Sequence, residues 1–160
     1  MRLFCGVIKI MINDHILIKN GQHLDNVLET LDIQQHSLGV LAVLNAKYNL
    51  PLVNATNESR FKQAKDFILN CNGEQIRLAP DLFAELCHLV TANLTELKQP
   101  MKGIFLLRKA ISKLQLYDSQ LTSIHADLCQ LCLLAKSFKP AIEILDIDIT
   151  GICQENNQAK

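Results

Sequence analysis

The sequence predicts an all-α fold, a TPR-like or HEAT-like α-solenoid of antiparallel helix pairs. Apolar residues recur at helical spacing almost throughout the chain beyond residue 22. Only 6 Gly and 4 Pro occur among 160 residues, too few for the many turns of an all-β sandwich. Two segments also resemble each other at offsets of 42 and 38 residues, the length of one helix pair in a solenoid. A four-helix bundle is the structural alternative.

The first half of the chain shows two amphipathic patterns, over residues 24–31 and 36–48, followed by a polar loop over residues 49–57 that contains Pro51. A third helix is predicted from Phe61 to Cys71. We expect Asn72 and Gly73 to end it, with the glycine in a left-handed conformation. Residues 3–12 fit a helix or a strand.

The second half predicts four more helices. Pro80 suits the first turn of a long helix that closes at Gln99 and Pro100, and residues 101–114 form the next. Asp118 or Ser119 is expected to cap the helix that spans residues 121–135, and Pro140 opens the last helix. The repeat lies in this half: residues 83–87 resemble residues 125–129, and Gly103-Ile104 matches Ala141-Ile142.

Charge and composition exclude several functional classes. Lys plus Arg and Asp plus Glu number 16 each, so the chain lacks the positive field that would attract nucleic acid or an anionic membrane. Lys9 interrupts the apolar N-terminal stretch, which is too short to span a membrane and lacks a cleavage pattern for secretion. The six cysteines lie mostly in apolar helical patterns, which favours a reduced, intracellular protein.

The CxxC motif of Cys129 and Cys132 has the spacing of zinc and redox sites, but it lies in the middle of a predicted helix without further ligands. We interpret both residues as packing thiols. Cys87 and His88 are adjacent on a helix and point about 100° apart, so we predict a core cysteine and a surface histidine instead of a nucleophile and its base.

The remaining polar combinations carry no specific signal. They are His125 with Asp127, and Asp146 with Asp148. A row of basic residues at helical spacing lacks interleaved aromatics, so a solvated face is expected instead of an RNA platform; its members are Lys98, Lys102, Arg108 and Lys113. We therefore predict no catalytic residue, no metal site and no cofactor.

Four strings resemble the subunit-three family of the COP-9 signalosome in sequence, order and spacing. They are HLDNVLETLDIQQHSLGVLAVL (residues 23–44), FILNCNGEQIRLAPDLFAELCHLVT (67–91), QLTSIHADLCQLCLLAK (120–136) and FKPAIEILDIDITGIC (138–153). The resemblance implies a helical-repeat arm over residues 22–155, with residues 1–21 unmatched and residues 156–160 a tail that stops before the PCI winged-helix module.

The resemblance also implies a function. We expect a non-catalytic scaffold in the complex that deneddylates cullin-RING ubiquitin ligases, in the cytoplasm and nucleus, with other signalosome subunits as direct partners and cullin-RING ligases as indirect ones. The chain looks like a fragment, which we expect not to take a normal place in the complex by itself. Its last repeat should expose Ile142, Ile144, Leu145 and Ile147 and favour self-association. The alternatives are a generic TPR-like adaptor and a small secreted helical protein.

Overall fold

The computed structural model describes residues 21–50 and 56–152. The predicted strip 3–12, the loop around Pro51, Cys5 and Cys153 lie outside them. The described residues form eight helices and two very short strands: α2 (Gly21–Thr30), α3 (Ser37–Tyr48), α4 (Asn57–Asn70), α5 (Gly73–Ile76), α6 (Pro80–Glu96), α7 (Met101–Leu114), β1 (Gln120–Leu121), α8 (Ile124–Leu134), α9 (Lys139–Leu145) and β2 (Gly151–Ile152).

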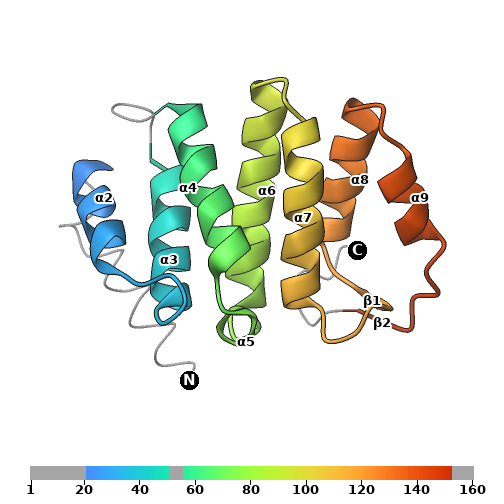
Figure 1. The fold of residues 1–160 in the computed structure, drawn as a ribbon, viewed down its shortest axis with the longest axis horizontal. Coiled ribbons are helices and arrows are strands. Elements are labelled where there is room, and N and C mark those ends of the chain that lie inside the picture. The colour runs from blue at the N-terminus through green and yellow to red at the C-terminus, as the bar shows by residue number, and fades with distance from the viewer. Residues whose placement is uncertain (1–20, 51–55, 153–160) are drawn as a thin grey trace.

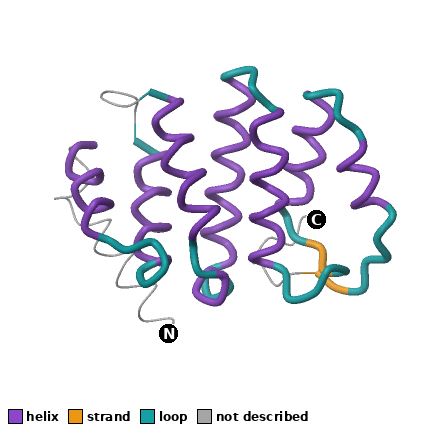
Figure 2. The backbone as a smooth tube through the Cα atoms, in the orientation of Figure 1, coloured by secondary structure: helices purple, strands orange, loops and turns teal. Residues whose placement is uncertain are grey.

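The long helices stand side by side in two rows, with α2 and α9 at opposite ends (Figures 1 and 2). In one row α3 packs against α6 and α6 packs against α8, and in the other α4 packs against α7. Three hairpins, α3–α4, α6–α7 and α8–α9, connect the rows, while α2 lies against α3. The predicted all-α helical repeat is confirmed, and this open array is not a closed four-helix bundle.

Most helix predictions agree with the structure, including the start of α6 at Pro80 and the full span of α7. The helix α4 begins at Asn57, before the predicted Phe61. The reason is a cap: the Thr56 hydroxyl accepts a hydrogen bond from the Ser59 amide at 3.1 Å, which satisfies a free donor of the first turn.

Two predicted helix boundaries are wrong. Gly73 has no positive φ. Instead, Asn72 caps the short helix α5 by accepting hydrogen bonds from the amides of Glu74 and Gln75. Asp118 and Ser119 do not cap α8, which begins at Ile124 after a Ser123 cap position.

The segment before α8 is used for pairing instead. Strands β1 and β2 are parallel, with Gln120 opposite Gly151 and Leu121 opposite Ile152. This pairing returns the chain after α9 to the turn between α7 and α8 (Figure 1). A Cβ atom at Gly151 would come within 2.2 Å of the Tyr117 hydroxyl, so a larger residue there would require the half-exposed Tyr117 side chain to move.

One continuous apolar core runs along the array between the two rows. Phe67 of α4 and Phe83 of α6 meet edge to face near its centre, with ring centroids 6.4 Å apart. At Gly103 a Cβ atom would lie 2.4 Å from a Leu131 methyl and 2.6 Å from a Leu94 methyl. The small residue therefore lets α7 approach both α6 and α8 closely.

The two repeats share the geometry of their joints. Lys98 after α6 and Lys136 after α8 both have φ of 54°. The amide of the following residue bonds back to the last turn in each case, Gln99 to Leu94 and Ser137 to Cys132, both at 2.9 Å. These are Schellman endings, in which the left-handed position is usually glycine. A proline then follows each joint.

Cationic side chains donate hydrogen bonds to the carbonyl groups at three further helix ends. Lys113 of α7 donates to the carbonyls of Leu69 and Cys71 at the end of α4, at 2.9 and 2.7 Å. Arg60 donates to the carbonyls of Tyr48 and Leu50 after α3. Arg77 donates to the carbonyl of Lys113 at the end of α7. Each positive charge lies at the negative end of a helix dipole, which is favourable.

Within the described part of the chain, no helix has the length and apolar character needed to cross a membrane.

Candidate interaction surfaces

The CxxC cysteines lie on α8, and both thiols are free. Cys132 is fully buried in the core, whereas Cys129 is half-buried. Burial raises the pKa of the Cys132 thiol, and the neighbouring Cys129 raises it further. Because the thiolate is the reactive form, this environment makes Cys132 a poor nucleophile.

Cys87 and His88 of α6 point in different directions. Cys87 is fully buried, while His88 lies at the surface of the α6–α8 contact, where its Nδ1 contacts the Asp127 carboxylate. Asp127 is therefore the partner of His88, which is 39 residues away in sequence. The adjacency of α6 and α8 in one row produces this pair, and the similarity of the two repeats was the sequence signal that could have suggested it.

His125 has a structural task at the start of α8. Its Nδ1 lies 3.0 Å from the Thr122 amide and 2.9 Å from the Thr122 hydroxyl. The same Nδ1 also lies 3.1 Å from the Thr122 carbonyl oxygen, so the imidazole ring is held against the Thr122 backbone. These contacts tie the first turn of α8 to the residue before its Ser123 cap position.

The other carboxylates singled out in the sequence, Asp146 and Asp148, are exposed after α9. Among residues 21–50 and 56–152, no three His, Cys, Asp or Glu residues gather where they could hold a metal ion.

The basic row divides in two. Lys98, Lys102 and Arg108 are exposed, as a solvated face requires. Lys113 differs, since its ammonium group is bound to the end of α4. For this residue the solvated-face prediction is wrong, because α4 and α7 pack directly and bring the ammonium group over the free carbonyls.

The C-terminal apolar face is formed by exposed side chains on and after α8 and α9: Leu133, Leu134, Phe138, Ile142, Leu145, Ile147 and Ile149. Ile142 and Leu145 are 53% and 76% exposed. Of the four residues predicted for this face, Ile144 instead turns inward and packs on the core. Exposed apolar side chains that follow one another so closely along the chain favour an interaction role for this end of the array.

A groove of about 330 Å³ lies beside this face, between α7 and α9, and Leu128 and His125 of α8 contribute to its lining. Arg108 of α7 and Glu143 of α9 pair across it at 3.1 Å. Their side chains are 54% and 44% exposed, so water screens this ion pair.

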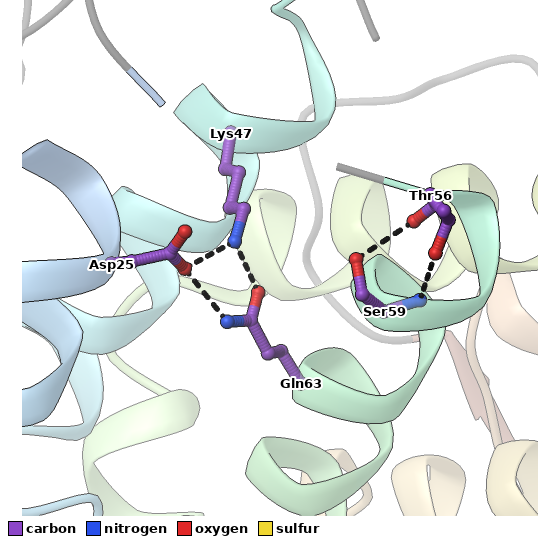
Figure 3. Close-up of polar contacts among 5 residues, drawn as sticks. All are labelled: Asp25, Lys47, Thr56, Ser59 and Gln63. Carbon is purple, nitrogen blue, oxygen red and sulfur yellow. Dashed lines mark hydrogen bonds and ion pairs between the residues drawn. The ribbon is translucent and has the colours of Figure 1, made fainter. Parts of the chain in front are cut away.

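A second groove, of about 550 Å³, lies at the other end of the array between α2 and α4. Lys47 of α3 is almost fully buried here, and its ammonium group contacts Asp25 of α2 and Gln63 of α4 (Figure 3). Gln63 also donates to Asp25 at 2.8 Å. These contacts join three helices beside the Thr56–Ser59 cap (Figure 3).

The Asp25 carboxyl has a pKa below its usual 3.8. Partial burial raises it, but the hydrogen bonds from Lys47 and Gln63 and the charge of Lys47 together outweigh burial. Asp25 is therefore held in its charged form.

Comparison with known proteins gives consistent matches. The family described as COP9 signalosome complex subunit 3, N-terminal helical repeats, matches residues 7–160. This match begins nearer the N-terminus than the strings quoted above. COP9 signalosome complex subunit 3 of Drosophila melanogaster is 44% identical over 138 residues, which are 86% of this chain and 31% of the relative.

The subunit of the same name from Dictyostelium discoideum is 41% identical over 139 residues, 84% of this chain and 32% of the relative. The chain thus spans about a third of the length of these two curated relatives. The predicted resemblance is confirmed: this chain belongs to the COP9 signalosome complex subunit 3 family and matches its N-terminal helical repeats.

Proposed function

We propose that this chain acts as a non-catalytic scaffold arm of the COP9 signalosome, the complex that deneddylates cullin-RING ubiquitin ligases. The observation that carries the proposal is the identity of 41–44% to subunit 3 of two distant organisms over most of the chain. Other signalosome subunits would be its direct partners, and cullin-RING ligases indirect ones. The cytoplasm and nucleus are the expected locations.

The roles of the polar side chains support a scaffold. Lys113 and Arg60 hold helix ends, and His125 ties the first turn of α8 to Thr122. These groups fix the arrangement of helices and are committed to backbone atoms. The isopeptide cleavage would then belong to another subunit of the complex.

The C-terminal apolar face supports an interaction role. Its most exposed member, Leu145, is 76% accessible, and burial of a leucine side chain stabilises a contact by roughly 1.5–3 kcal/mol. We propose that this face contacts neighbouring protein in the complex and that, in the isolated chain, it associates with a second copy. Sedimentation velocity should then show a fraction of dimer that rises with protein concentration. A monomer at all concentrations would contradict self-association.

Affinity purification tests the scaffold proposal. The tagged chain is expressed in cells, and signalosome subunits among the bound proteins are quantified by mass spectrometry. Ile142→Glu/Leu145→Glu should reduce their recovery, because charge on the face opposes burial. Leu78→Glu/Met101→Glu is the matched control, since Leu78 and Met101 are 51% and 61% exposed outside the C-terminal face. Recovery of unrelated proteins without signalosome subunits would favour a generic adaptor instead.

The absence of catalysis is tested directly. The purified chain is incubated with a neddylated cullin, and the modified and unmodified cullin are separated by gel electrophoresis. We expect no cleavage, whereas the complete complex serves as the positive control. Cleavage by the isolated chain contradicts the proposed scaffold role.

A further inference from the structure

The α2–α4 groove opens between two helices that meet less closely than α4 and α7 do. Helices α4 and α7 pack on each other, whereas α2 and α4 are bridged at the groove by the hydrogen bond from Gln63 to Asp25. Its volume of about 550 Å³ lies within the range of about 300–1,000 Å³ found for ligand pockets. The space admits a few side chains of a bound segment.

The inner surface of the groove is apolar. Val40, Leu44 and Phe67 are almost fully buried beneath it. Leu28 and Ile33 are only partly buried, so apolar surface remains accessible within the groove. Covering it with apolar side chains would release water at a gain of about 25 cal/mol per Å².

The groove carries negative charge. Three carboxylates, of Asp25, Glu29 and Asp66, and the single ammonium of Lys47 line it, so its net charge is −2. Lys47 is already committed to Asp25. Glu29 and Asp66 are exposed and form no ion pair within the described part of the chain. A cationic group beside them would gain attraction at little desolvation cost.

We propose that the α2–α4 groove binds a short peptide segment of another protein, in which apolar side chains are flanked by lysine or arginine. The apolar side chains enter between α2 and α4, and the cationic ones lie over Glu29 and Asp66. Spacing of the apolar side chains at i, i+3 and i+7 allows one face of a helical segment to supply all of them.

A designed probe tests this proposal: a fluorescein-labelled synthetic peptide with leucines at i, i+3 and i+7 and lysines between them. Fluorescence anisotropy measures its Kd for the full chain at physiological salt. Glu29→Lys/Asp66→Lys should weaken binding about tenfold or more. Glu85→Lys/Asp148→Lys makes the same charge change at exposed sites outside the groove and should leave the Kd nearly unchanged.

Two further variants separate docking from simple charge attraction. A peptide with serine in place of each leucine should lose binding. Ser59→Trp should also abolish binding, because it adds bulk at the groove while keeping the backbone amide that Thr56 caps. Circular dichroism checks that each variant folds. Equal binding of the serine peptide, or full binding by both folded groove variants, would overturn the proposal.

A basic segment of this same chain is the remaining alternative to a peptide of another protein in the α2–α4 groove. Arg2, Lys9 and Lys19 stand among apolar residues before α2 in the sequence. If that segment filled the groove, Lys9→Glu/Lys19→Glu would strengthen binding of the probe peptide. That result would overturn the assignment to another protein, whereas an unchanged Kd supports it.

Discussion

The α2–α4 groove and the α7–α9 groove are built alike. Each lies between two helices, and the helix that comes between those two in the sequence, α3 or α8, contributes to its lining. Their polar contacts differ. Lys47 is 4% exposed and joins three helices, with its partner Asp25 41% exposed, whereas Arg108 and Glu143 are both exposed, at 54% and 44%, and join two. A buried cation can fix a helix only when its partners satisfy it, while an exposed pair contributes little.

The comparison indicates two kinds of helix attachment in one fold. At the N-terminal end a polar network around the buried Lys47 helps to hold α2, and at the C-terminal end α9 depends mainly on apolar packing against α8. The following changes measure that difference.

The largest effects are expected from the apolar residues beneath the grooves. Leu44→Ala and Leu128→Ala should each lower the free energy of unfolding by about 2–5 kcal/mol, because both side chains are essentially fully buried and would leave cavities. Urea denaturation followed by circular dichroism measures both. Losses that differ greatly between the two ends would show that apolar packing, not the polar contacts, distinguishes them.

The polar contacts should separate the two ends. Lys47→Met keeps most of the side-chain volume but removes the donor to Asp25 and Gln63, so we expect a loss of about 1–2 kcal/mol. Arg108→Met removes an exposed partner of Glu143 and should cost less than about 1 kcal/mol. The same urea titrations compare them, and equal losses would contradict the proposed difference.

The free energy of unfolding should depend on pH through Asp25 in the α2–α4 groove. The folded-state pKa of Asp25 is lowered, so its contribution is present above the unfolded value of about 3.8 and is lost as pH falls through the folded pKa. Asp25→Asn should therefore destabilise the chain at pH 7 and have a shrinking effect below about pH 4. Asp148→Asn is the exposed control. A constant effect of Asp25→Asn across this range would refute the assignment.

The smallest expected effect concerns salt. Glu143→Gln should change stability by less than about 1 kcal/mol at low ionic strength, and about 1 M salt should remove the difference, because screening acts strongly on exposed pairs. Thermal unfolding at the two salt concentrations measures it. Persistence of the full effect at high salt would show that the pair is shielded from water.

The sequence predicted the helices well because their apolar spacing and prolines are local signals. Pro80 and residues 101–114 show this directly. The two helix ends that were wrong depend on competing uses of a residue. Asn72 caps a new helix instead of ending the previous one, and the segment around Ser119 is drawn toward β2, which lies about 30 residues later.

The sequence alignment of the two repeats places α6 against α8 with an offset that differs from the structural one. The structural joints at Lys98 and Lys136 are 38 residues apart, whereas the alignment of residues 83–87 with 125–129 uses an offset of 42. Four residues are about one helical turn, so both alignments place the same face toward the core. Apolar spacing alone cannot distinguish them.

The grooves could not be predicted because they depend on contacts between distant segments. Asp25 and Gln63 are 38 residues apart, and Lys47 would ordinarily be assigned to solvent. The pairing of His88 with Asp127 has the same origin. In contrast, the exposed C-terminal face followed from the apolar residues of α9, although the inward turn of Ile144 required the structure.

The hydrogen bonds from cationic side chains to helix ends affect how the array unfolds. Lys113 of α7 reaches the end of α4, and Arg77, which follows α5, reaches the end of α7. Loss of one helix pair would therefore strip its neighbour of both apolar cover and hydrogen-bond donors, which raises the nearest-neighbour coupling of a repeat protein. The described helices should accordingly melt in a single cooperative transition, without a stable half-folded form.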